Sequence, residues 1–392
     1  MTTRMSPENR IYDVAVIGAG VFGAWTAHHL RQAGQRVALV DCYGAAHARA
    51  SSGGESRIIR MGYGDDEIYT RSAMRSLVLW LEFFEKARQP LFYETGVLWT
   101  AAPGNPYTEN TRQTLARCGV RFETLSTAQM QSRYPQMEFA AGAWGIFEPE
   151  SGALMARRAV QAVVADVVRN GVAYLCEAIA TPAGRGAALT SLRTSAGRDI
   201  RAGAFVFACG PWLPKLFPGL LGKRIEITRQ EVFFFGAPPG DRRFAPPAMP
   251  VWIDFSDPRG PYGFPDLEDC GVKIALDRHG PPIDPDSSDR APSAEGMAAA
   301  RDFLAGRFPA LRHAPLLEAR VCQYENTSSG DFLIDRHPDF PNVWLIGGGS
   351  GHGFKHGPAA GEYLAARVLN GGETEPRYSL ATKAETPHRS VF

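Results

Sequence analysis

Residues 12–41 read YDVAVIGAGVFGAWTAHHLRQAGQRVALVD, and this stretch decides the fold. It opens with a short apolar, β-branched run at 14–17, which is typical of a strand buried on both faces. Glycines in the pattern G-x-G-x-x-G follow, and a helix is expected over 24–33. A second apolar strand is expected over 37–40 and ends on Asp41. Together these elements form one βαβ unit.

The glycines of this pattern have separate tasks. Gly18 permits the tight turn out of the strand, Gly20 lets a pyrophosphate approach the backbone, and Gly23 lets the helix pack against the sheet. The N-terminus of the helix offers N–H groups and a positive dipole end to phosphates. Asp41 can accept hydrogen bonds from both hydroxyls of an adenosine ribose, and it would repel a 2′-phosphate. The unit predicts a dinucleotide site rather than a structural turn, but it does not separate FAD from NAD.

Length and composition describe an ordinary globular protein. The chain has 392 residues, of which 44% are hydrophobic and 21% charged, and its formal net charge is +1. This length allows more than one hydrophobic core. The absence of a long basic or acidic run argues against nucleic acid or a membrane surface as a partner. Neither a signal peptide nor a membrane-spanning apolar run is found, so a cytoplasmic protein is expected.

The cysteines are widely spaced and form no C-x-x-C pair. This pattern predicts neither a zinc site nor a disulfide framework, so no metal is expected. We expect reduced thiols, most of them buried. The six positions are Cys42, Cys118, Cys176, Cys209, Cys270 and Cys322.

Nucleotide-type strands recur at the start, in the middle and at the end of the chain, with β-rich sequence between them. This order predicts an α/β fold with one Rossmann-like dinucleotide domain built from separated segments. A substrate domain with a mostly antiparallel sheet is inserted. We expect the first domain over 1–90, 151–215 and 320–392, and the second over 91–150 and 216–319.

Several further elements are expected from periodicity. A helix over 67–86 would bury a stripe formed by Ala73, Leu77, Trp80, Leu81 and Phe84. The other expected elements are an irregular, strand-like region at 91–150, a helix at 153–169, a strand at 171–176, a hairpin at 188–208, an antiparallel sheet at 225–277, a helix at 297–308 and a polar tail over the last twenty residues.

Two glycine-rich segments carry charged residues. The loop at 42–64 is too long for a simple connection, and it contains Arg57 and Arg60. Near the C-terminus, a strand runs into the glycine-rich turn at 347–353, and a helix follows Lys355. A strand-to-helix turn of this kind directs N–H groups and a helix dipole at an anion, such as the pyrimidine side of a reduced flavin.

The order of several motifs resembles one known family. These motifs are GAGVFG at 18–23, Asp41, SRIIR at 56–60, CGVK at 270–273, VCQY at 321–324 and GHGFK at 351–355. The chain resembles the monomeric sarcosine oxidase family of FAD amine oxidases over nearly its whole length. Relatives include N-methyltryptophan, pipecolate and fructosamine oxidases, all with the D-amino-acid oxidase-like fold. The resemblance implies FAD, oxidation of a secondary amine or amino acid (N-alkyl or cyclic) to an imine, and reduction of O2 to hydrogen peroxide.

The resemblance also implies roles for single residues. Cys322 matches a cysteine bonded covalently to the flavin, and the alternative is a buried free thiol. Lys273 matches the lysine beside which oxygen reacts, and the alternative is a lysine that merely ends a strand. Arg60 and Lys355 match the pair that binds the substrate carboxylate, and the alternative is a pair of surface cations. Arg57 matches an arginine that assists oxidation or cofactor attachment.

Aromatic and cofactor-binding positions complete the expected site. Tyr262 and Tyr324 match residues of the substrate pocket, and Tyr63 either joins them or belongs to the core. The expected cofactor-binding residues are Gly18, Gly20, Val21, Phe22, Gly23, Asp41, Ser51, Ser56, Arg57, Cys322, Gly349, Gly351, His352, Gly353, Phe354 and Lys355.

Two positions depart from the sarcosine oxidase pattern. Gly53 and Asp277 stand where sarcosine oxidases carry histidines. Glycine would make room, and aspartate would bring negative charge. Both changes point to a substrate larger or more basic than sarcosine.

Four functions remain open at this point. The first is the oxidase, a monomer that takes a small amine or amino acid and O2. The second is a flavin dehydrogenase that passes electrons to a quinone or another protein, against which Lys273 argues. The third is an NAD-dependent dehydrogenase, which would lack the yellow colour of flavin. The fourth is a flavin-binding module without catalysis.

Overall fold

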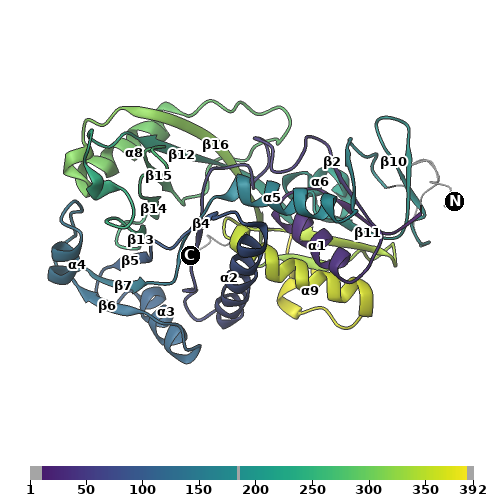
Figure 1. Ribbon diagram of the computed structural model, residues 1–392, viewed down its shortest axis with the longest axis horizontal. Helices are drawn as coiled ribbons and strands as arrows, with labels where there is room; N and C mark the ends of the chain where they lie inside the picture. The colour runs from purple at the N-terminus through teal and green to yellow at the C-terminus, as the bar shows by residue number, and fades with distance from the viewer. Residues whose placement is uncertain (1–10, 183–185, 386–392) are drawn as a thin grey trace. The chain divides into compact units, whose positions relative to one another are not determined.

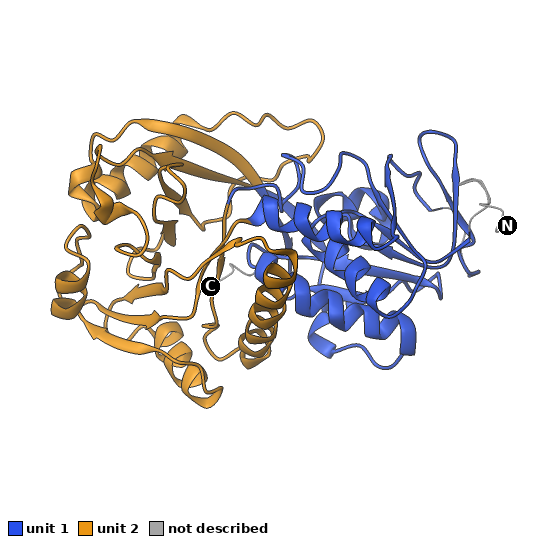
Figure 2. Cartoon of the chain, in the orientation of Figure 1, with its two compact units in different colours: residues 1–55, 156–228, 323–391 blue, residues 56–155, 229–322, 392 orange. Residues whose placement is uncertain are grey.

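The computed structural model describes residues 11–182 and 186–385, and it divides into two compact units (Figures 1 and 2). Of the described residues, unit 1 comprises 11–55, 156–182, 186–228 and 323–385, and unit 2 comprises 56–155 and 229–322. Residues 56–90, which were expected in the dinucleotide domain, lie in unit 2. They do so because the short strand β3 (Arg57–Ile59) pairs with β8 (Gly152–Leu154), which also pairs with β4 (Phe92–Tyr93).

Unit 1 contains a seven-stranded sheet of order β17-β18-β11-β1-β2-β9, with β10 paired to β11. Strands β18, β11, β1, β2 and β9 run parallel, as the sequence predicts for a Rossmann-like domain. The expected hairpin is β10 against β11. The strands are β1 (Ile11–Ile17), β2 (Val37–Asp41), β9 (Ala173–Cys176), β10 (Ser191–Arg193), β11 (Asp199–Phe207), β17 (Leu333–Arg336) and β18 (Val343–Gly347).

The first helix packs closely between two others. Helix α1 (Val21–Gln32) lies against α9 (Gly357–Asn370) and α5 (Ala156–Arg169). A Cβ on Gly361 of α9 would lie 2.7 Å from the backbone carbon of Trp25, so only glycine permits this approach. Helix α1 begins three residues earlier than expected, because Gly20 is its N-cap and Gly23 lies inside it.

Unit 2 is organised around an eight-stranded, mostly antiparallel sheet of order β16-β12-β15-β14-β13-β5-β7-β6. The exception is β13, which runs parallel to β5. The chain passes through unit 2 twice: first over Ser56–Met155, and then over Arg229–Cys322, which it enters along β12 and leaves along β16. The strands are β5 (Val97–Ala101), β6 (Glu123–Ser126), β7 (Trp144–Glu148), β12 (Ile225–Phe235), β13 (Val251–Asp254), β14 (Pro261–Phe264), β15 (Val272–Leu276) and β16 (Leu316–Thr327).

The alternation of side chains gives β15 two different faces. Val272 and Ile274 belong to the large core of unit 2, which includes Phe303 of helix α8 (Ala294–Arg307). Lys273 and Ala275 point to the opposite face. This period of two separates the lysine from the main core.

The region 91–150 contains two helices that the sequence analysis missed. Helix α3 (Pro106–Arg117) begins where the Asn105 side chain accepts a hydrogen bond from the Thr108 backbone N–H at 3.0 Å. Helix α4 (Thr127–Arg133) begins with a capping box formed by Ser126 and Gln129. Threonines form most of the buried face of α3, so apolar periodicity gave no signal, whereas the capping residues did.

Helix boundaries and faces also differ in detail. Helix α2 (Glu67–Ala87) forms where expected, but Leu81 is 42% exposed and Ser76 is buried instead. Helix α5 begins at Ala156 rather than at residue 153, because β8 occupies 152–154. Helix α8 begins before the expected start, because Ser293 caps it by accepting the Gly296 N–H at 2.9 Å.

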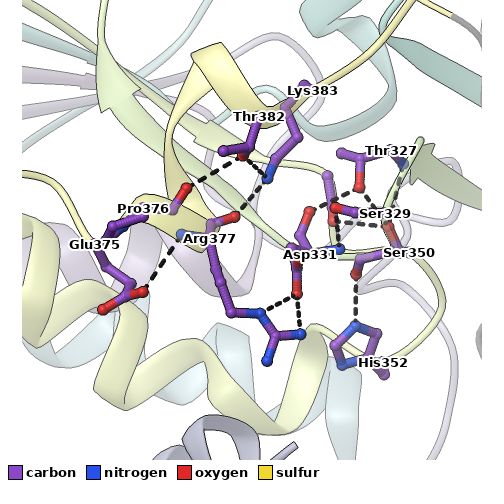
Figure 3. A network of polar contacts seen from close by, with 12 residues as sticks. Thr327, Ser329, Asp331, Ser350, His352, Glu375, Pro376, Arg377, Thr382 and Lys383 are labelled. Atoms are coloured by element: carbon purple, nitrogen blue, oxygen red, sulfur yellow. Dashed lines mark hydrogen bonds and ion pairs between the residues drawn. The ribbon is translucent and has the colours of Figure 1, made fainter.

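The C-terminal segment is docked and is not a free polar tail (Figure 3). The Arg377 guanidinium donates to the Asp331 carboxylate at 2.6 Å, and the Lys383 ammonium is buried against the Arg377 carbonyl. Burial lowers the pKa of Lys383 to about 8. Through Asp331 the segment supports the loop after β16, where the Thr327 N–H donates to the Ser350 hydroxyl at 3.2 Å. Residues 386–392 of the expected tail lie outside the described residues.

The cysteines are less buried than expected. None of the six, all of which lie among the described residues, forms a disulfide; Cys42, Cys176 and Cys270 are exposed, and the others are half-buried. Cys42 and Cys176 lie at the ends of the adjacent strands β2 and β9, where the chain reaches the surface. Within residues 11–182 and 186–385, no helix combines the length and apolar character that a bilayer crossing requires.

Candidate active site

The glycine turn after β1 is built as the motif predicts. Gly18 has a φ of +104°, and a Cβ on it would lie 2.3 Å from the Ala208 carbonyl oxygen. A Cβ on Gly23 would lie 1.9 Å from the Gly18 carbonyl oxygen. At Gly20, by contrast, a Cβ would meet only the Ser52 hydroxyl, at 3.5 Å. Packing within the protein therefore leaves the backbone at Gly20 open to a phosphate group.

Asp41 is fixed by the backbone around it. Its Oδ2 accepts the Ala19 N–H at 2.7 Å, and its Oδ1 accepts the N–H groups of Tyr43 and Gly44, both at 2.9 Å. A carboxylate offers about four lone-pair positions, so about one remains for a ribose hydroxyl. The strand end thus presents an oriented acceptor.

Two adjacent serines connect the loop after β2 to the rest of unit 1. The Ser51 hydroxyl donates to the Gln323 carbonyl at 3.1 Å. The Ser52 hydroxyl accepts the N–H of Val21, the first residue of α1, at 3.1 Å. The sequence analysis named Ser51 and missed Ser52, for which the only signal was its position beside Ser51.

The glycine turn after β18 lies against the first turn of α1. A Cβ on Gly353 would lie 2.9 Å from the Phe22 ring. Gly351 has a φ of +80°, and a Cβ on it would lie 2.7 Å from the Tyr324 ring. The fold therefore brings the two glycine motifs together from opposite ends of the chain, with Tyr324 packed on the second.

His352 and Lys355 stabilise the glycine turn after β18. His352 Nε2 lies 3.0 Å from the Gly330 carbonyl oxygen, and its ring stacks on Phe332 with centroids 4.8 Å apart. The Lys355 ammonium donates to the His352 carbonyl at 2.9 Å. Phe354 is half-buried. Because Lys355 is only 4% exposed, it is not a surface cation.

Arg60 is buried between two aromatic rings in unit 2. Its guanidinium carbon lies 4.4 Å from the centroid of Tyr63 and 4.7 Å from that of Trp99, and the residue is 3% exposed. Cation–π contacts of this kind restrict a side chain to one orientation. Tyr63 therefore contacts the expected substrate-binding arginine, and Trp99 is a second contact that the sequence analysis missed.

Glu148 organises the segment that carries Arg60. Its carboxylate accepts hydrogen bonds from Met61 N–H at 2.7 Å, Gly62 N–H at 3.1 Å, Trp99 Nε1 at 2.8 Å and the Ser151 hydroxyl at 2.6 Å. A buried carboxylate with this many donors is well satisfied. It fixes both the Arg60 backbone and the indole beside the guanidinium. No sequence signal pointed to it.

Ser56 joins three of the expected residues. Its carbonyl accepts the Lys273 ammonium and Arg57 Nη1, both at 2.9 Å. Arg57 Nη2 in turn lies 3.3 Å from the Cys322 sulfur. Lys273 is 2% exposed, and its ammonium lies 4.3 Å from the centroid of Phe264. Lys273 is thus part of a buried cluster and does not merely end a strand.

The comparison with known proteins identifies the family. A family model described as FAD dependent oxidoreductase matches residues 13–367. The chain belongs to this family. Monomeric sarcosine oxidase of Arthrobacter sp. (strain TE1826) is 31% identical over 94% of this chain and 95% of its own. N-methyl-L-tryptophan oxidase of Salmonella arizonae (strain ATCC BAA-731 / CDC346-86 / RSK2980) is 28% identical over 94% and 97%.

The fold of this FAD-dependent oxidoreductase also matches solved structures. L-proline dehydrogenase from P. horikoshii superposes with a TM-score of 0.82 at 20% identity, covering 95% of this chain and 97% of the other. Likeness at this identity shows the fold. The Rossmann-like domain with an inserted, mostly antiparallel substrate domain is thereby confirmed.

FAD, the cofactor of the family, fits the residues present in unit 1. The open backbone at Gly20 suits the pyrophosphate, and Asp41 suits the ribose. The glycine turn after β18 lies against the first turn of α1 on the same side of unit 1, because a Cβ on Gly353 would lie 2.9 Å from the Phe22 ring. When bound, FAD supplies a two-electron acceptor that no side chain can replace.

The cation that contacts the Cys322 sulfur is Arg57. One expectation about the neighbourhood of the site is wrong. Gly53 does not open a pocket, because a Cβ there would lie 2.1 Å from the His47 carbonyl oxygen. A backbone carbonyl fills the space that the sequence analysis assigned to substrate.

The covalent bond to the flavin remains a prediction for this FAD-dependent oxidoreductase. The Arg57 guanidinium contacts the Cys322 sulfur and so places a positive charge beside the atom that would form the bond. After acid precipitation of wild-type protein, the yellow colour should stay with the polypeptide. Cys322→Ser should release the flavin into the supernatant, whereas the control Cys270→Ser, at an exposed thiol, should retain it. Yellow supernatant from the wild type would refute covalent attachment.

Proposed function

We propose that this enzyme oxidises the C–N bond of a secondary amine or amino acid, N-alkyl or cyclic, to an imine, with O2 as the electron acceptor and hydrogen peroxide as the product. The observation that carries the proposal is the buried Lys273 ammonium, which Ser56 holds beside Arg57 and Cys322. The names of the relatives, sarcosine oxidase and N-methyl-L-tryptophan oxidase, support the substrate class.

Arg60 and Lys355 are proposed to bind the substrate carboxylate. Both cations are almost fully buried, and a buried charge is stabilised by a hydrogen-bonded counter-charge. Tyr63 and Trp99 hold the Arg60 fork in one orientation before substrate arrives. Much of the catalytic effect is then orientation of the reacting C–H bond. The cationic pair also favours the neutral form of the substrate amine.

Lys273 is proposed to accelerate the reaction with O2. One-electron reduction of O2 places negative charge on it, and a fixed ammonium in a site that excludes water stabilises that charge. The Ser56 carbonyl and the Phe264 ring fix the ammonium. Arg57 acts through Cys322 and the flavin rather than on the substrate.

The substrate pocket is proposed to lie on the Lys273 face of the sheet in unit 2. Tyr262 packs on this face with Phe234 and Ala275. Asp277 follows β15 at the same alternation as Lys273 and favours a basic substrate. Because a backbone carbonyl occupies the space beside Gly53, charge and not extra space distinguishes this pocket from that of a sarcosine oxidase. We further propose that the enzyme acts as a cytoplasmic monomer.

An anaerobic screen tests the proposal. The yellow enzyme is mixed without oxygen with secondary and primary amino acids and with amines that lack a carboxylate. Bleaching by N-alkyl or cyclic amino acids, followed by rapid return of the colour and peroxide formation in air, is expected. Bleaching with slow return would identify a dehydrogenase instead. A flavin that no amine bleaches would indicate a flavin-binding module without catalysis.

A further inference from the structure

A buried carboxyl group lies at the cofactor edge of unit 1. The parallel strands β1, β11 and β18 end together there, because Ile17 is paired with Phe207 and Phe207 with Leu345. Ligands of such sheets bind outside the carboxyl ends of the strands. Glu325, near the end of β16, reaches this edge: its Oε2 lies 3.2 Å from the position of a Cβ on Gly347.

The two oxygens of Glu325 have different surroundings. The carboxylate accepts the backbone N–H groups of Gly348 and Gly349, which belong to the glycine turn after β18. Its Oε2 has no hydrogen-bond partner within residues 11–182 and 186–385, so Oε1 is the acceptor. Burying a charged oxygen without a donor costs far more free energy than burying a neutral, protonated one. Burial accordingly raises the pKa of Glu325 to about 7.

The elements around Glu325 place few charged groups near its carboxylate. After β11, Gly210 lies 3.8 Å from Oε1, measured from the position of its Cβ, and Cys209 is the titratable group on that side. Burial raises the pKa of the Cys209 thiol well above its usual value, so this thiol stays neutral. The turn itself presents glycine backbone, and the next titratable groups along it are His352 and Lys355.

We propose that Glu325 is a positioning residue of the FAD site: one oxygen holds the turn at Gly348 and Gly349, and the other carries a proton that links the charge of the cofactor to pH. A reduced flavin carries negative charge, which raises the proton affinity of a nearby carboxyl group. Reduction would therefore draw a proton from solvent onto Glu325. The proposal rests on the assignment of this turn to the flavin and does not require an amine substrate.

The midpoint potential of the bound flavin between pH 5.5 and 8.5 tests the proton link. Electrons come from a chemical reductant equilibrated with reference dyes, so a failure of amine oxidation would not affect the result. In the wild type, the pH dependence near pH 7 should steepen by up to a tenfold change in equilibrium constant per pH unit, which is about 30 mV for two electrons. Glu325→Gln should remove the extra slope, and Glu318→Gln, on the same strand, should retain it.

The retention of FAD by Glu325→Gln and by one further variant, Glu325→Leu, tests for a merely structural role. Glu325→Gln keeps an acceptor for both N–H groups without charge, so it should retain FAD, and loss of FAD at every pH would overturn the proposal. Glu325→Leu lacks the acceptor and should retain FAD less well than the glutamine variant, and equal retention would remove the positioning role. A wild-type potential without the extra slope would refute the proton link whatever the variants do.

The pH dependence of protein stability gives a second test of the proton on Glu325. A carboxyl group whose pKa is raised to about 7 in the folded state stabilises the fold at low pH, and this contribution is lost as the pH rises through 7. The melting temperature of Glu325→Gln relative to wild type should therefore rise between pH 5.5 and 8.5. A difference that is constant over this range would contradict a proton on Glu325.

Discussion

Replacing Lys273 with methionine is expected to leave anaerobic bleaching of the flavin by substrate nearly unchanged and to slow the return of colour in air by about 10²–10³-fold, the usual effect of removing one electrostatic group from a reacting oxygen. The ammonium is 2% exposed and is held by the Ser56 carbonyl at 2.9 Å. Methionine is similar in length and keeps the contact with the Phe264 ring. Only the fixed charge is lost, and the proposed target of that charge is O2.

Stopped-flow absorbance separates the two half-reactions in this experiment. Lys223→Met is the matched control, because the Lys223 side chain is 80% exposed. It should reoxidise at the wild-type rate. A Lys273→Met variant that returns to the oxidised spectrum as fast as wild type would show that the ammonium has no part in the oxygen reaction. A variant that is slow only in bleaching would place Lys273 on the substrate instead.

Replacing Arg60 with methionine is expected to lower kcat/KM for a carboxylate-bearing substrate by about 10²–10³-fold, which corresponds to about 3–4 kcal/mol of lost transition-state stabilisation. The guanidinium is buried between Tyr63 and Trp99 and presents a preorganised fork. Arg60→Lys keeps the charge but not the bidentate geometry, so it should still lose about tenfold or more.

A comparison of two substrates, with and without a carboxylate, shows whether Arg60 binds the carboxylate or supports the fold. The same amine without its carboxylate, for example as an ester, should be oxidised equally slowly by wild type and variant. Arg71→Met, at a surface arginine paired with Glu67, is the control and should behave as wild type with both substrates. An equal loss for the acid and the ester would mean that Arg60 supports the fold of its segment and does not bind the carboxylate.

The sequence could predict whatever depends on residues close together in the chain. The βαβ unit is such a case, because the turn glycines, the helix and Asp41 follow one another within thirty residues. The end of β11 at 204–207 and the strand β18 are another case, since each is a continuous apolar run that a buried strand satisfies. The capping residues Asn105 and Ser126 are also visible in the sequence. The α3 helix gave no apolar periodicity, because most of its buried residues are threonines.

The resemblance to a family identified candidate residues, but it did not show which contacts fix their side chains. The contacts among Ser56, Arg57, Lys273 and Cys322 join residues up to 265 positions apart. These residues lie on or beside β3, β15 and β16, which belong to two different sheets, so both sheets must form before those atoms meet. The same holds for Trp99 and Glu148, which fix Arg60 from strands β5 and β7.

By itself, the sequence determined the Rossmann-like unit and its dinucleotide site, because local backbone geometry and strand burial leave few alternatives for such a pattern. The tertiary structure alone decided that a carbonyl occupies the space beside Gly53, that the C-terminal segment is docked, and that Glu325 is buried with one oxygen that has no partner among the described residues. Burial and charge depend on which distant segments surround a side chain. That neighbourhood exists only once the sheets have formed.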